Sequence, residues 1–220
     1  AGADSLAFGK NAAASVKNTI ALGLNSKSSA ENATALGLNA AAAGADSLAF
    51  GSAARTSDVN SIALGNQAAA SKANTIALGT QTKAAGANAI ALGNQANASV
   101  FQSIALGTCA KASAADTVAL GTGSIASGNS AIALGNKAQA LGSNSISIGK
   151  GNIVSGNNSA AIGDPTTITG SGTYSVGNNN GTIAANNSGE FGNNNTITGA
   201  LDGVRVIGNT NTVSADGAMV

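Results

Sequence analysis

Histidine and tryptophan are absent from this 220-residue sequence, which contains one cysteine, one proline and 2% aromatic residues. Without histidine, the usual catalytic triads and zinc sites cannot be built. The single cysteine, Cys109, excludes an intrachain disulfide framework. Charged residues make up 9% of the chain and lie singly, with a formal net charge of +1. We therefore expect no enzyme, no cofactor, no metal and no nucleic-acid partner.

Two further signals are missing. No apolar run reaches the roughly 18 residues of a transmembrane helix, so this chain is not expected to insert into a membrane. The sequence opens at Ala1 with neither an initiator Met nor a signal-peptide pattern, and we expect it to be a piece of a longer protein.

Bulky core residues are scarce, and Ala, Ser, Thr, Asn and 30 Gly take their place. A compact globule of this composition would bury too little apolar area to offset chain entropy, which leaves a disordered segment or a stacked repeat. Periodicity favours the repeat, because an apolar residue followed by Gly recurs every 14 residues, at Gly9, Gly23, Gly37, Gly51, Gly65, Gly79, Gly93, Gly107, Gly121, Gly135, Gly149, Gly163 and Gly177. Two looser repeats end at Gly192 and Gly208.

Each repeat predicts a first strand directly before its Gly, typified by Ile62-Ala63-Leu64. A spacing of two places the bulky pair on one face of the strand and the small residue on the other. We expect the bulky pairs to form the core of the coil, and Tyr174 to fill the coil as well. The predicted roll core is Ile20, Leu22, Ile62, Leu64, Ile76, Leu78, Ile90, Leu92, Ile104, Leu106, Ile132, Leu134, Ile146 and Ile148.

A second strand follows two turn residues after the Gly. Its small residues, such as Ala68 and Ala70, are expected to face inward, with a polar residue between them facing water, as Lys83 does between Thr82 and Ala84. A second corner carries Asn or Asp nine residues after the Gly, because these residues tolerate left-handed backbone angles. The corner residues are Asn18, Asp46, Asn60, Asn74, Asn88, Asp116 and Asn144. The pattern predicts an all-β solenoid of flattened coils that pair in parallel.

The first strand is apolar on both faces, which predicts a covering partner in front of it. With the bulky residues inside, the small residues would form an exposed apolar stripe that identical chains bury by meeting along it. The alternative is that a weakly apolar Ala stripe is tolerated in water. The expected contact residues between chains are Ala21, Ala63, Ala77, Ala91, Ala105, Ala119 and Ala133.

The motif Ser/Thr-Ile-Ala-Leu-Gly, a two-residue turn and then Ala-x-Ala, as in residues 61–70, resembles the YadA-like head repeats of trimeric autotransporter adhesins. This resemblance covers about residues 1–177. It implies a left-handed parallel β-roll, a homotrimer, and display on the bacterial cell surface, tethered to the outer membrane by regions that this sequence lacks. It also implies adhesion to host matrix or cell-surface receptors, such as collagen, fibronectin or CEACAM.

From about Asp164 onward the sequence turns Asn- and Gly-rich and departs from the motif, and residues 178–220 follow the regular repeats of residues 1–177. Larger residues replace the small ones of the second strand, as at Ile168, Ile197 and Val213, and Gly189 and Arg205 replace the expected inner Ile. We interpret residues 178–220 as irregular terminal repeats or as the junction between head and neck; a degenerate insertion is the alternative.

Few residues in the sequence are candidates for reacting with or binding another molecule. Cys109 lies in a turn where other repeats have Gln67 and Gln81, which favours a surface residue over a nucleophile. Val100 and Phe101 occupy a corner that is polar elsewhere, which makes them candidate receptor contacts. Packing on an adjacent corner or sequence drift is the favoured alternative.

Two other functions compete with adhesion. An ice-binding solenoid would carry Thr in nearly every outward position of one column, whereas the second strand carries Lys27, Arg55, Lys83 and Lys111 there. A structural spacer without binding activity fits the repeat equally well.

Overall fold

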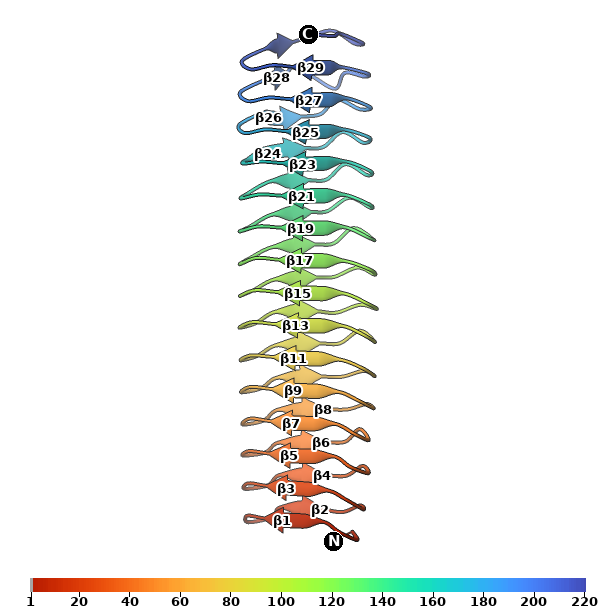
Figure 1. The fold of residues 1–220 in the computed structure, drawn as a ribbon, viewed down its shortest axis with the longest axis vertical. Coiled ribbons are helices and arrows are strands. Elements are labelled where there is room, and N and C mark those ends of the chain that lie inside the picture. Colours follow the sequence, from red (N-terminus) through yellow and green to blue (C-terminus); the bar gives the residue numbers. More distant parts are fainter. Residues whose placement is uncertain (1) are drawn as a thin grey trace. The chain divides into compact units, whose positions relative to one another are not determined.

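The computed structural model describes residues 2–220, and all of their regular structure is β-strand (Figure 1). The predicted parallel β-solenoid is confirmed, since successive strands pair in parallel with a 14-residue offset, as Ile62 does with Ile76. The chain divides into two compact units, Ala1–Ala110 and Lys111–Val220, each of which has two sheets back to back. We call the Gly that recurs every 14 residues the anchor Gly. Sheet A contains the strand before each anchor Gly, and sheet B contains the strand after it.

The first unit builds both sheets from short strands that alternate along the chain. Its sheet A consists of β1 (Leu6–Phe8), β3 (Ile20–Leu22), β5 (Thr34–Leu36), β7 (Leu48–Phe50), β9 (Ile62–Leu64), β11 (Ile76–Leu78), β13 (Ile90–Leu92) and β15 (Ile104–Leu106). Its sheet B consists of β2 (Ala13–Ala14), β4 (Lys27–Ser28), β6 (Ala41–Ala42), β8 (Arg55–Thr56), β10 (Ala69–Ala70), β12 (Lys83–Ala84) and β14 (Asn97–Ala98).

The second unit repeats this arrangement. Its sheet A consists of β17 (Val118–Leu120), β19 (Ile132–Leu134), β21 (Ile146–Ile148), β23 (Ala160–Ile162), β25 (Tyr174–Val176), β27 (Gly189–Phe191) and β29 (Arg205–Ile207). Its sheet B consists of β16 (Lys111–Ala112), β18 (Ile125–Ala126), β20 (Gln139–Ala140), β22 (Ile153–Val154), β24 (Thr166–Ile168) and β26 (Gly181–Ile183), while β28 (Thr196–Ile197) and β30 (Thr212–Val213) form a separate pair.

Both corners of a coil depend on left-handed residues. Asn60, Gln67 and Asn74 have φ of 55°, 56° and 57°. Their side chains form ladders from coil to coil, as where Asn60 Nδ2 donates to Asn74 Oδ1 at 3.1 Å. The predicted second-corner residues all have positive φ, which confirms their role: Asn18, Asp46, Asn60, Asn74, Asn88, Asp116 and Asn144.

The interior of the coil is filled by small residues, and here the prediction was wrong. The middle residue of each sheet A strand points inward, and these alanines are fully buried within a single chain: Ala21, Ala63, Ala77, Ala91, Ala105, Ala119 and Ala133. They cannot contact another chain. The inward residues of sheet B, such as Ala68 and Ala70, are buried as predicted.

The bulky residues of sheet A therefore point outward. The predicted core residues are half-buried or exposed: Ile20, Leu22, Ile62, Leu64, Ile76, Leu78, Ile90, Leu92, Ile104, Leu106, Ile132, Leu134, Ile146 and Ile148. Tyr174 is exposed as well. The bulky residues are excluded from the interior because the inward position directly before nearly every sheet A strand is occupied by a small residue, often Ser or Thr. The hydroxyl group of this residue usually donates a hydrogen bond to a backbone carbonyl of the adjacent corner. Thr75 Oγ1, for example, donates to the carbonyl of Lys72 at 2.6 Å. Four small inward residues per coil leave no space for Ile or Leu.

Larger residues fill the coil only in the second unit. Ile168, Ile197 and Val213 are buried there, as the sequence suggested, and they belong to a cluster with Val154, Ala161, Ile183, Ala185, Val204 and Val206. The two looser repeats are also confirmed, because Gly192 and Gly208 have the same φ, 138° and 136°, as the regular anchors. The assignment of residues 178–220 to a head-to-neck junction stays a prediction.

Candidate interaction surfaces

The outer face of sheet A is largely apolar within each unit. Each strand places two residues outward, and in the first unit most of these are Ile, Leu or Phe in two columns. Ile76 is 37% exposed although its neighbours in register, Ile62 and Ile90, flank it on both sides. An apolar face of this extent is typical of a surface that is buried against another chain. The exposed apolar surface of sheet A thus consists of the Ile and Leu columns and not of the Ala column.

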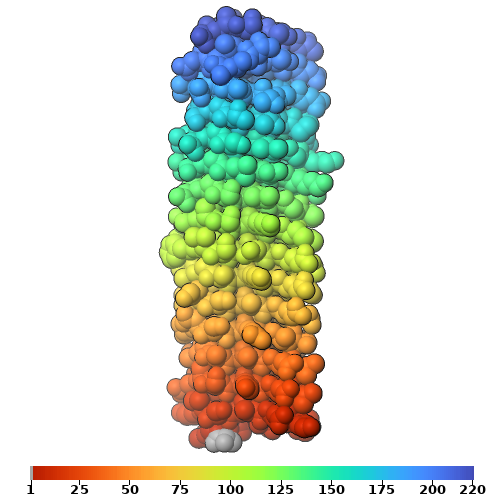
Figure 2. All heavy atoms as spheres, turned by 180° about the vertical axis from the view of Figure 1, so that it is seen from behind, coloured from red at the N-terminus to blue at the C-terminus, as the bar shows by residue number. Residues whose placement is uncertain are grey.

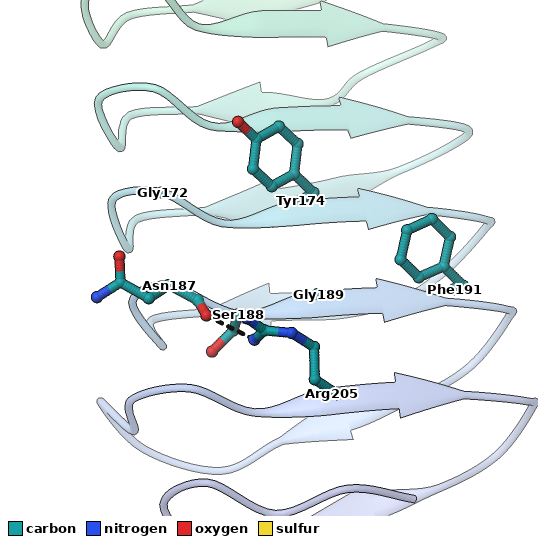
Figure 3. Close-up of a pocket in the computed structure, with 7 residues that line it drawn as sticks. All are labelled: Gly172, Tyr174, Asn187, Ser188, Gly189, Phe191 and Arg205. Carbon is teal, nitrogen blue, oxygen red and sulfur yellow. Dashed lines mark hydrogen bonds between the residues drawn. The ribbon is translucent and has the colours of Figure 1, made fainter.

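Gly189 interrupts this face in the second unit, because β27 lacks one of its two outward side chains. The hollow left by it has a volume of about 340 Å³, and Tyr174, Phe191 and Arg205 form its walls (Figure 3). Arg205 Nη1 donates to the carbonyl of Asn187 at 2.6 Å, which holds the guanidinium at the edge of the hollow. Gly189 and Arg205 therefore lie in the outward column, and the expectation that they replace an inner Ile was wrong.

The outer face of sheet B differs in chemistry. It lies on the side of the first unit seen in Figure 2. Its outward column alternates between cations and alanine, with Lys27, Arg55 and Lys83 all exposed. A second hollow of about 280 Å³ opens over Ala41, between Lys27 and Arg55.

Val100 and Phe101 lie at the second corner, as predicted. Phe101 is 48% exposed, and Val100 is partly buried. The Val100 carbonyl accepts a hydrogen bond from Ser103 Oγ at 2.6 Å, which fixes the corner that presents the ring. Their contact with a receptor stays a prediction.

Cys109 belongs to a ladder of side chains at the first corner, which is the turn between the sheet A strand and the sheet B strand of a coil. It is exposed and has φ of 57°, and its Sγ lies 3.4 Å from Oε1 of Gln95. Nε2 of Gln95 in turn donates a hydrogen bond to Oε1 of Gln81. The thiol replaces a glutamine in this ladder, in agreement with a surface role. Within residues 2–220, no group of three or more His, Cys, Asp or Glu side chains is placed to hold a metal ion. The same residues contain no helix long and apolar enough to cross a membrane.

Glu190 is the one charged side chain that is fully buried among residues 2–220. It occupies the inward position of β27, where other coils have Ala, Ser or Val, and its in-register neighbours are Ser175 and Val206. Neither carboxyl oxygen has a hydrogen-bond partner. Burial without a partner disfavours the charged form and raises the pKa of Glu190 to about 7. Sequence reasoning missed this residue, although a Glu in an Ala column was a visible signal.

The buried carboxyl predicts that acid stabilises the second unit. The folded-state pKa of Glu190 lies above its ordinary value of 4.5, so the folded state binds the proton more tightly. The added stability is complete below pH 4.5 and is lost as the pH rises through about 7. With about 1.4 kcal/mol per pKa unit, the loss is about 3 kcal/mol.

This pH dependence can be measured by urea unfolding at pH 4.5 and pH 8, with Glu190→Gln as the matched variant. Glu190→Gln should remove most of the difference between the two pH values, because glutamine is isosteric and cannot ionise. A difference of the same size in Glu190→Gln would show that another group causes it.

The fold and its surfaces define a class of protein: a parallel β-solenoid of 14-residue coils with one apolar and one polar outer face. Comparison with known protein families agrees with this description of the fold. The YadA head domain repeat (2 copies) matches residues 1–26, 17–40, 42–68, 70–99, 101–124, 126–152 and 140–164. A search of curated proteins found no match.

Because these segments cover most of the sequence, the chain belongs to the YadA head domain repeat family. This family consists of adhesin-type domains of trimeric autotransporters, which are surface-exposed, anchored in the outer membrane and generally non-enzymatic.

Proposed function

We propose that this chain is the head of a homotrimeric bacterial surface adhesin that attaches to host extracellular matrix or cell-surface receptors. The observation that carries the proposal is the apolar outer face of sheet A. Burying the exposed half of each Ile or Leu side chain contributes about 1 kcal/mol, and each chain presents many of them. The number three follows from the family, whose members are trimeric.

The hollow at Gly189 supports the same arrangement. A column that is bulky in most coils has no side chain at this position, between Tyr174 and Arg205. A large side chain of a neighbouring copy can enter the hollow and contact the Tyr174 and Phe191 rings. Such a fit would set the relative register of the three chains.

Oligomeric state gives the direct test of assembly. Sedimentation equilibrium of the purified chain at micromolar concentration should return three times the 20.7 kDa chain mass. A folded monomer would contradict the proposal.

Receptor attachment is tested separately on collagen, fibronectin and CEACAM-type ectodomains coated on a surface. Phe101→Ala should lower binding to the cognate receptor about tenfold, because truncating an exposed aromatic anchor at an interface costs about 1–2 kcal/mol. Lys17→Ala is the matched control, since Lys17 holds the same position in its coil as Phe101. Equal binding by both variants would remove Phe101 from the site, and absence of binding to every host surface would favour a spacer.

A further inference from the structure

The outward column of sheet B in the first unit places a cation in every second coil. Parallel pairing brings these residues into one line in the order Ala13, Lys27, Ala41, Arg55, Ala69, Lys83 and Asn97. Neighbouring strands are about 4.8 Å apart, so consecutive cations lie about 9.5 Å apart. We call Lys27, Arg55 and Lys83 the cationic column.

The charges of the cationic column are not neutralised within the chain. The three side chains are exposed and make no ion pair with other described residues. The carboxylates of the first unit lie elsewhere, in the turns and bends of the second corner, at Asp4, Glu31, Asp46 and Asp58. The column is therefore a line of one charge sign on a face without acidic groups.

The gaps between the cations have room for a ligand. Ala41 stands between Lys27 and Arg55, and its short side chain leaves the hollow of about 280 Å³ that these cations flank. Asn25 and Asn39 form one wall of this hollow and supply amide groups. Nδ2 of Asn25 donates to Oδ1 of Asn39 at 3.1 Å, which orders both amides. Two cations beside amide donors suit a sulfate or carboxylate group.

We propose that the cationic column binds a linear sulfated or carboxylated polysaccharide, which lies along the column with an acidic group at each cation. The proposal rests on the proposed function in one respect: if trimers form through sheet A, sheet B faces away from the partner chains. The column suits an acidic polysaccharide better than a nucleic acid. The phosphates of one strand of a duplex recur about every 3.4 Å along the helix axis, more densely than the cations, and no aromatic side chain stands in the column to stack on bases.

Binding to immobilised heparin and dextran sulfate tests the proposal, with variants that remove the same number of charges from two places. The triple variant Lys27→Ala, Arg55→Ala, Lys83→Ala removes all three positive charges of the cationic column. The matched triple variant Lys10→Ala, Lys17→Ala, Lys72→Ala removes three exposed cations from the corners. The column variant should bind heparin about tenfold more weakly at low salt and show a shallower salt dependence. The corner variant should bind within about twofold of the unaltered chain.

Equal losses in both triple variants, or unchanged binding in the column variant, would overturn the proposal. Equal or tighter binding of single-stranded DNA of matched charge would overturn the assignment to polysaccharide. Sedimentation of each variant separates this outcome from failure of the trimer. A monomer that still binds heparin through the column contradicts the proposed assembly alone, and a trimer that does not bind heparin contradicts the present inference alone.

Discussion

Replacing Ile76 with lysine is expected to convert the proposed trimer into monomers at micromolar concentration. Ile76 stands in the middle of the apolar columns of the first unit, with Ile62 and Ile90 beside it. In a trimer, three lysines would enter the apolar interface without an anionic partner. An unpaired buried charge costs about 3–5 kcal/mol, and each trimer would contain three. Sedimentation equilibrium measures the result directly.

Asn97→Lys is the matched control for Ile76→Lys. It adds the same charge to the outward column of sheet B, where Lys83 already stands in the adjacent coil. This variant should remain trimeric with an unchanged melting temperature. A trimeric Ile76→Lys variant with unaltered stability would show that sheet A is not the interface.

The second large effect is expected at the anchor glycines. Gly65 has φ of +135°, a region that residues with a side chain rarely adopt, and a Cβ at this position would lie 2.4 Å from the carbonyl oxygen of Gly79. Both backbones belong to stacked coils, so neither can retreat without breaking the pairing. Gly65→Ala should therefore destabilise the first unit by about 3 kcal/mol or more, measured by urea unfolding.

Gly123→Ala is the control that separates steric contact from positive φ. Gly123 has φ of +67°, and the nearest atom to an added Cβ is Lys137 Cγ at 3.6 Å. Ala53 has φ of 56° at the corresponding position of another coil, which shows that alanine is accepted there. The control should lose only about 1–2 kcal/mol. Equal losses at both positions would mean that the contact with Gly79 is unimportant.

The candidate surfaces were only partly visible in the sequence. The cations at Lys27, Arg55 and Lys83 and the aromatic corner at Phe101 can be assigned to outward positions from the repeat alone. The hollows beside Ala41 and Gly189 cannot, because their size depends on how neighbouring coils stack. Glu190 was missed because its burial depends on which face of β27 points inward.

The face of each strand that points inward is the feature that the sequence did not determine. The sequence alone predicts the period of 14, the two strands, the two corners and the parallel pairing. Each of these features is indicated by residue types that recur at a constant spacing. Alternation with a period of two separates the faces of a strand but does not say which face is inside. Only the tertiary structure decides this. In the first unit the two sheets lie so close together that only Ala, Ser and Thr fit between them. Ile and Leu are therefore displaced to the outside, where a partner chain can cover them.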